Sequence, residues 1–133
     1  MRSENSLMSI TLNTELQENK TMNTIQVPIR VEDEDLEDIL ESAFISAKYW
    51  LYDENIEYID KFTYKFQVPI TDDDSELEEY TLDKKKLLEG LTQYISEYGI
   101  ASLEDGRINT CVLDNCDCEL ILQYALFKEQ VFG

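Results

Sequence analysis

The acidity of this chain constrains its fold more than any other feature. It contains 29 Asp and Glu residues against 11 Lys and Arg residues, so its net charge is −18, and it contains no histidine. Small soluble domains usually have a net charge of about 2 to 8 in magnitude. Hydrophobic residues nevertheless make up 43% of the chain, which is enough to form a core. We therefore predict a folded acidic domain rather than a disordered chain.

The first 23 residues differ from the rest. They are rich in Ser, Asn, Thr and Glu, and their apolar residues are scattered. We expect residues 1–23 to form a poorly ordered tail and residues 24–133 to form one α+β domain. The tail has no apolar segment typical of a secretory signal, and no run approaches the roughly 20 residues of a membrane span. The expected location is the cytoplasm, with no membrane partner.

Hydrophobic periodicity predicts the elements of the domain. Residues 24–31 alternate as in a half-buried strand, and residues 33–51 repeat their apolar positions as in an amphipathic helix. Residues 61–70 and 78–82 indicate a β-hairpin with an acidic tip. Two helices follow, one from the capping residue Asp83 to Gly99 and one after Asp114. The predicted order is β-α-β-β-α-α, with a small antiparallel or mixed sheet of about three strands packed against three helices.

A run of acids at the start of the first helix is the main candidate site. Seven of the ten residues from Glu32 to Glu41 are acidic. Carboxylates three or four residues apart on a helix lie about 5–6 Å from one another, close to the spacing of phosphates along a nucleic-acid strand. The more specific hypothesis is a phosphate-mimicking face. The alternative is a solvated helix start whose acidic side chains interact favourably with the helix dipole. The candidate binding residues are Glu34, Glu37, Asp38 and Glu41, with Asp72, Asp73 and Asp74 at the hairpin tip.

Aromatic residues form a second candidate surface. Tyr49, Trp50 and Tyr52 end the first helix. They either cover the edge of the core or form an exposed aromatic edge that contacts another protein, because Trp and Tyr often anchor interfaces.

Catalysis and metal binding are not expected. Without histidine no Ser-His or Cys-His pair exists, and the chain contains no glycine-rich phosphate loop. No histidine is present to complete a zinc site with Cys111, Cys116 and Cys118, and only Asp114, Asp117 or Glu119 lies close to them in the sequence. The acids from Asp72 onward do not match an EF-hand loop. Three crowded cysteines also fit a reducing compartment rather than a disulfide framework. We therefore predict a non-enzyme with no catalytic residue, metal or cofactor.

Three segments resemble a known family. They are EDLEDILESAF with the Tyr49-Trp50 pair, YTLDKKKLLEGLTQYI (residues 80–95) and LILQYALFKEQVFG (residues 120–133). From Val31 onward the chain is similar to small proteins of phages, prophages and other mobile elements of low-GC Gram-positive bacteria, which share a QYALF-x-E-x-V-x-G-like tail. Their last helix stops at a Gly-Glu step, where this chain has Lys128-Glu129. The resemblance implies an accessory or anti-defence role in a bacterial host.

An acidic surface repels nucleic acid and anionic lipid and attracts basic proteins. The leading hypothesis is therefore an inhibitor that binds a basic host protein, either a nucleic-acid-binding or a defence protein, through its acidic face, without direct nucleic-acid contact. The alternatives are an assembly protein that forms a homo-oligomer through the aromatic edge, and a binder of a small ligand or cation near the hairpin tip.

Overall fold

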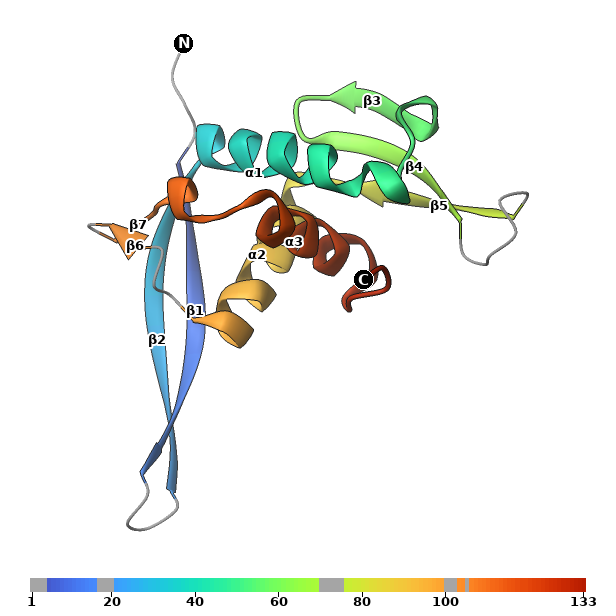
Figure 1. The fold of residues 1–133 in the computed structure, drawn as a ribbon. Coiled ribbons are helices and arrows are strands. Elements are labelled where there is room, and N and C mark those ends of the chain that lie inside the picture. The colour runs from blue at the N-terminus through green and yellow to red at the C-terminus, as the bar shows by residue number, and fades with distance from the viewer. Residues whose placement is uncertain (1–4, 17–20, 70–75, 100–102, 105) are drawn as a thin grey trace.

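The computed structural model describes residues 5–16, 21–69, 76–99, 103–104 and 106–133. These residues form an α+β fold with three α-helices and two sheets (Figure 1). The elements in chain order are β1 (Asn5–Leu16), β2 (Thr21–Glu32), α1 (Asp33–Ser46), η1 (Ala47–Tyr49), η2 (Asp53–Asn55), β3 (Ile56–Asp60), β4 (Thr63–Pro69), β5 (Leu77–Leu82), α2 (Lys84–Tyr98), β6 (Leu103–Glu104), β7 (Arg107–Ile108), η3 (Thr110–Val112) and α3 (Asn115–Phe127), where η marks a short 3₁₀ turn.

One sheet is antiparallel, with β4 between β3 and β5. The predicted hairpin of residues 61–70 and 78–82 corresponds to β4 and β5, and the alternation is confirmed because Phe66 and Val68 are buried. The sequence did not predict β3. Four of its five residues are exposed, so the strand has no buried face, and its sequence does not alternate between apolar and polar residues.

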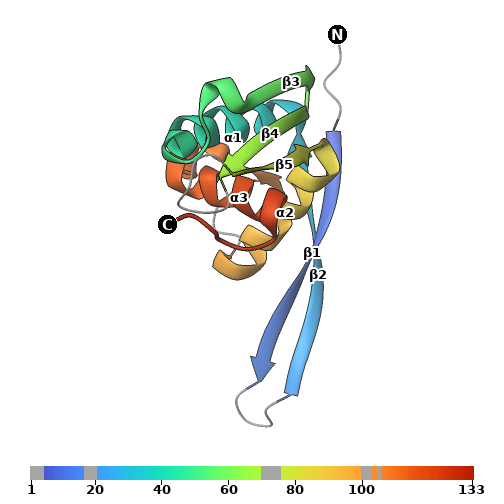
Figure 2. The same ribbon diagram turned by 90° about the vertical axis from the view of Figure 1, so that its right-hand side faces the viewer.

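The other sheet has the order β1-β2-β7-β6. The predicted strand of residues 24–31 lies within β2, and over residues 28–31 its alternation is confirmed, since Ile29 and Val31 are buried while Pro28 and Arg30 are exposed. Residues 5–16, which the sequence assigns to a tail, form β1 and pair antiparallel with β2 from Asn5↔Glu32 to Leu16↔Thr21. Figures 1 and 2 show β1 and β2 as a long ribbon that extends beyond the helices.

The helices enclose the main core. Helix α3 packs against both α1 and α2, as expected for the most apolar helix. The predicted first helix extends to residue 51, but α1 ends at Ser46 and η1 follows. The chain turns there because the N–H groups of Trp50 and Leu51 both donate to the Ala47 carbonyl, at 3.0 and 2.8 Å. Both side chains are thereby buried in the core.

Three helix termini follow from local chemistry. The Asp83 carboxylate accepts the N–H of Lys86 at 2.8 Å and begins α2, and Gly99 ends it with a φ of 96°. Lys128 follows α3 with a φ of 63°, in the left-handed region that favours glycine. Its N–H donates to the Tyr124 carbonyl at 3.0 Å. The last helix therefore ends tightly although lysine occupies this position.

Candidate functional site

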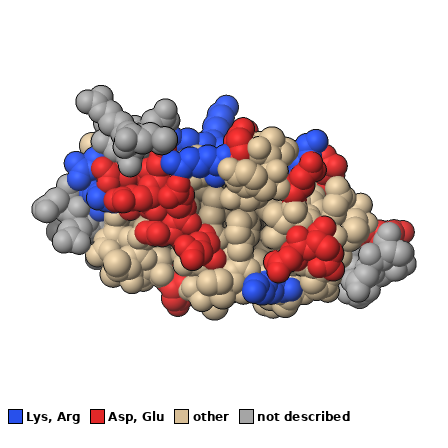
Figure 3. All heavy atoms as spheres, turned by 90° about the horizontal axis from the view of Figure 1, so that it is seen from above, with Lys and Arg blue, Asp and Glu red and all other residues tan. Residues whose placement is uncertain are grey.

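The exposed side of α1 presents the predicted acidic residues. Glu34, Glu37, Asp38 and Glu41 are all exposed. The opposite side of the helix is anchored in the core by Leu36, Ile39, Leu40 and Ala43. Figure 3 shows acidic side chains in several groups on this side of the molecule, with the largest group toward the end where α1 begins and basic side chains at its border. We call Glu34, Glu37, Asp38 and Glu41 the acidic face.

Two acids of the same run are not part of this surface. Asp33 and Asp35 are buried at the helix start. Asp35 accepts the N–H of Glu32 at 2.9 Å and completes a capping box with the Glu32 side chain. The Asp33 carboxylate forms an ion pair with Lys84 at 2.9 Å and a longer one with Lys61 at 3.7 Å. The acidic run is thus divided between helix capping and exposed surface.

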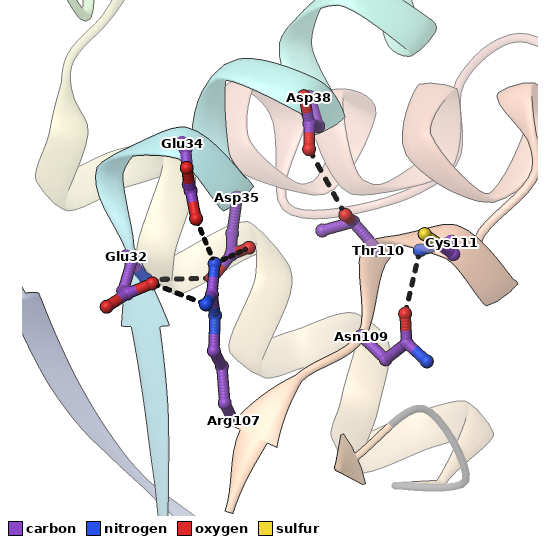
Figure 4. Close-up of polar contacts among 8 residues, drawn as sticks. All are labelled: Glu32, Glu34, Asp35, Asp38, Arg107, Asn109, Thr110 and Cys111. Carbon is purple, nitrogen blue, oxygen red and sulfur yellow. Dashed lines mark hydrogen bonds and ion pairs between the residues drawn. The ribbon is translucent and has the colours of Figure 1, made fainter.

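Arg107 neutralises the beginning of the acidic face (Figure 4). Strand β7 brings its guanidinium to α1 because Arg107 pairs with Arg30 of β2, directly before the helix. The guanidinium lies 2.6 Å from a Glu32 oxygen and 2.9 Å from an Asp35 oxygen, and it also pairs with Glu34. Hydrogen bonds to Asp35 and then Glu34 raise the pKa of Arg107 above its ordinary value. Sequence reasoning missed this residue, because 72 positions separate it from Asp35.

The negative charges of the other acidic-face residues have fewer basic partners. Glu37 pairs with the exposed Lys61 at 3.2 Å. Asp38 accepts a hydrogen bond from the Thr110 hydroxyl at 3.3 Å (Figure 4). Within the described part of the chain, neither Asp38 nor Glu41 takes part in an ion pair. The uncompensated charge of the acidic face therefore lies in its second half.

A polar groove of about 540 Å³ borders the acidic face. Its lining contains both acidic and basic side chains. Arg107 forms an ion pair with Asp35, and Asp38 accepts a hydrogen bond from Thr110. The lining residues are Arg30, Glu34, Asp35, Asp38, Arg107, Ile108, Asn109, Thr110 and Cys111. This arrangement offers hydrogen-bond partners and a negative border to a basic group. The predicted residues Asp72, Asp73 and Asp74 lie outside the described residues.

The aromatic residues divide between the two alternatives, because Trp50 lies in the core whereas Tyr49 and Tyr52 are exposed. Trp50 is only 2% exposed, and its ring stacks on Phe132 with centroids 4.5 Å apart. The turn after α1 directs the indole inward, where its N–H reaches a buried carboxylate, Glu119. Tyr49 and Tyr52 remain 53% and 38% exposed.

That buried carboxylate, Glu119 of α3, is a feature that the sequence did not predict. It is 6% exposed and accepts hydrogen bonds from four side chains. The donors are Ser46 Oγ at 2.6 Å, Tyr49 Oη at 2.6 Å, Trp50 Nε1 at 2.9 Å and Gln123 Nε2 at 3.1 Å. Burial and then the hydrogen bond to Glu119 raise the pKa of Tyr49 to about 12. In a chain with 29 acids, nothing in the sequence distinguishes Glu119 from a surface residue.

A pocket of about 690 Å³ opens beside Glu119. It lies where the ends of α1 and α2 meet α3 and the C-terminal segment. Its lining is rich in tyrosine and contains Ser46, Tyr49, Tyr94, Tyr98, Cys116, Asp117, Glu119, Leu120, Gln123, Gln130, Phe132 and Gly133. We call it the tyrosine pocket.

The cysteines are all free, with Cys111 and Cys116 exposed and Cys118 buried. Burial, followed by the charges of Asp117 and Asp114, raises the pKa of the Cys118 thiol to about 12, so this thiol stays protonated near neutral pH. In the described part of the chain, no group of three or more Cys, Asp or Glu residues is arranged to hold a metal ion. None of the described helices is long and apolar enough to cross a membrane.

Comparisons with protein-family models, curated proteins and solved structures found no match to this chain.

Proposed function

We propose that this chain is a non-enzymatic accessory protein of a phage or mobile element that inhibits a basic host or defence protein by binding it through the acidic face. The observation that carries the proposal is the placement of Asp38 and Glu41. Both are exposed on a helix whose other side is anchored in the core, and neither is neutralised by an ion pair within the described residues.

The physical basis of this proposal is electrostatic complementarity. The helix that carries these charges is already folded, so binding does not add the entropy cost of ordering its backbone. A net charge of −18 accelerates the encounter with a basic partner and repels nucleic acid. The aromatic-edge oligomer receives less support, because Trp50, its largest residue, is buried.

Charge reversal at two positions tests the proposal. The variant Asp38→Lys with Glu41→Lys is compared with Glu54→Lys plus Glu129→Lys, which changes the net charge equally at exposed positions outside the acidic face. Each immobilised protein is exposed to a lysate of a low-GC Gram-positive bacterium at low and high salt. We expect the wild type and the control variant to retain the same basic protein at low salt, and the acidic-face variant to lose it.

We expect thermal melting to show that both variants are folded, because exposed charges contribute only about 0–1 kcal/mol each to stability. Retention of the same protein by the acidic-face variant would contradict the proposal. Equal loss by both variants would show that net charge, and not the acidic face, determines binding.

A further inference from the structure

The tyrosine pocket is lined by aromatic and acidic residues, and both classes of side chain attract cations. The aromatic residues Tyr49, Tyr94, Tyr98 and Phe132 line it together with the acidic residues Asp117 and Glu119. The faces of aromatic rings are negative and attract cations placed over them. Carboxylates attract the same charge and accept its hydrogen bonds.

Glu119 supplies a negative charge that neutral groups hold in place. All four of its hydrogen-bond donors are uncharged side chains. Within the described residues, no ion pair includes Glu119, and the lining of the pocket contains neither Lys nor Arg. A buried carboxylate without a counter-ion is costly, so a cation that enters the pocket gains from its field.

The tyrosines at the pocket are placed to contact a planar group. The rings of Tyr94 and Tyr98 stack with centroids 4.9 Å apart and an interplanar angle of 29°. Tyr98 is 60% exposed, so its ring is available at the end of α2. An arginine guanidinium is flat, stacks on aromatic faces and donates several hydrogen bonds, whereas a lysine ammonium is a compact and strongly hydrated charge.

We propose that the tyrosine pocket binds the guanidinium of an arginine side chain. The pocket's preference for this group stands on its lining alone. That the arginine belongs to a basic protein partner rests on the proposed function. The pocket then adds a specific contact at the end of α1 opposite to the beginning of the acidic face.

Trp50 provides a direct measurement, because it is the single tryptophan of the chain. Its N–H donates to Glu119 and its ring stacks on Phe132, so an occupant of the pocket changes its fluorescence. The probes are Nα-acetyl-arginine amide, its neutral isostere Nα-acetyl-citrulline amide, and Nα-acetyl-lysine amide. We expect a saturable change with the arginine probe and at least tenfold weaker binding of the citrulline probe. Equal responses to arginine and citrulline, or none to arginine, would overturn the proposal; lysine binding as tightly as arginine would overturn the preference for a planar group.

A matched pair of tyrosine variants locates the binding. Tyr98→Ala removes an exposed ring of the pocket, and Tyr58→Ala removes a similarly exposed ring, at 63%, from β3. We expect Tyr98→Ala to weaken binding of the arginine probe at least fivefold and Tyr58→Ala to leave it unchanged. Equal affinities of the two variants would contradict the assigned pocket.

Thiol labelling gives a second readout. Exposed Cys116 lines the tyrosine pocket, and exposed Cys111 lines the groove beside α1. The arginine probe should slow modification of Cys116 and leave that of Cys111 unchanged. Protection of neither thiol would argue against binding in the pocket.

The same probe separates the two proposals. The Asp38→Lys and Glu41→Lys variant should bind the arginine probe within twofold of the wild type. If the probe binds but no basic protein is retained through the acidic face, the pocket stands and the proposed function fails. If the basic protein is retained while the probe does not bind, the pocket assignment fails alone.

Discussion

At the scale of single residues, Glu119 and Gln123 connect α3 to the segments around it. Glu119 accepts hydrogen bonds from residues at the end of α1 and in the following turn. Gln123 donates to Glu119 and to the Phe132 carbonyl, while its own carbonyl accepts the N–H groups of Val131 and Phe132, both at 2.8 Å. This network holds the C-terminal segment against the helix. Buried polar networks of this kind specify one arrangement when every member is satisfied.

Glu119→Ala should destabilise the protein, because it leaves the buried Trp50 N–H and the Ser46 hydroxyl without their acceptor. An unsatisfied buried donor costs about 1 to 3 kcal/mol. Urea denaturation followed by Trp50 fluorescence measures the change. Glu129→Ala, at an exposed position beyond the helix, is the control and should leave the midpoint unchanged. Equal midpoints for the wild type and Glu119→Ala would show that the network contributes little to stability.

Tyr49 predicts a specific response to alkaline pH. Burial and the hydrogen bond to Glu119 raise its pKa from 10.0 to about 12. A raised pKa in the folded state stabilises the protein fully below the unfolded pKa, and this stabilisation is lost as pH rises from about 10 to about 12. Denaturation at about pH 9 and pH 11.5 should show a smaller loss of stability in Tyr49→Phe than in the wild type. An identical pH dependence in both proteins would contradict this linkage.

At the scale of elements, the packing of α2 on α3 depends on one glycine. A Cβ on Gly90 would lie 2.6 Å from the carbonyl oxygen of Ile121 and 2.7 Å from the backbone nitrogen of Ala125. Both are backbone atoms, so no side-chain rotation relieves the clash. The two helices approach this closely because glycine leaves the space free.

Gly90→Ala should therefore lower the free energy of unfolding by about 1 to 3 kcal/mol, the usual cost of overpacking. Alanine is intrinsically the better helix former by about 1 kcal/mol, so an isolated helix would respond in the opposite direction. Thermal melting measures the effect, with exposed Glu89→Ala on the same helix as the control. Stabilisation by Gly90→Ala would show that α2 and α3 are farther apart than described.

Lys128→Gly should stabilise the end of α3. The left-handed conformation at φ 63° costs a non-glycine residue about 1 kcal/mol or more. The substitution gives up the ion pair with Glu89, but that contact is exposed and 3.8 Å long and contributes little. Glu89→Ala in the Lys128 background isolates the ion-pair contribution. A lower melting temperature for Lys128→Gly would show that the lysine contacts outweigh the backbone strain.

At the scale of the whole molecule, basic side chains neutralise the acidic residues in one region and leave a large net negative charge. Lys61, Lys84 and Arg107 gather at the start of α1 and pair with its acids. The net charge remains −18, so repulsion between like charges opposes the compact state. Salt screens this long-range repulsion and also weakens the exposed ion pairs.

Because repulsion exceeds the few ion pairs, the melting temperature should rise when NaCl increases from about 10 mM to about 500 mM. Differential scanning calorimetry at both concentrations measures the shift. The Glu54→Lys plus Glu129→Lys variant has less net charge and should show a smaller rise. A melting temperature that falls with salt would mean that the pairs around Lys61, Lys84 and Arg107 dominate.

Elements whose sequence signal is local could be predicted from the amino-acid sequence. Alternation in β2 and β4, the apolar repeat of α1, and the capping residues Asp83 and Gly99 each depend on neighbours along the chain. The exposure of Glu34, Glu37, Asp38 and Glu41 followed in the same way, because they fall outside the apolar side of the helix.

The burial of Asp33, Asp35 and Glu119, in contrast, follows from tertiary contacts and could not be predicted from the sequence. Arg107 donates a hydrogen bond to Asp35, and Trp50 donates one to Glu119, each across about 70 residues of chain. No local sequence pattern predicts such long-range contacts. The pairing of β1 with β2 and the exposed strand β3 likewise depend on backbone partners rather than on apolar periodicity. In a chain where carboxylates are everywhere, their individual roles follow from the hydrogen-bond donors that folding brings to them.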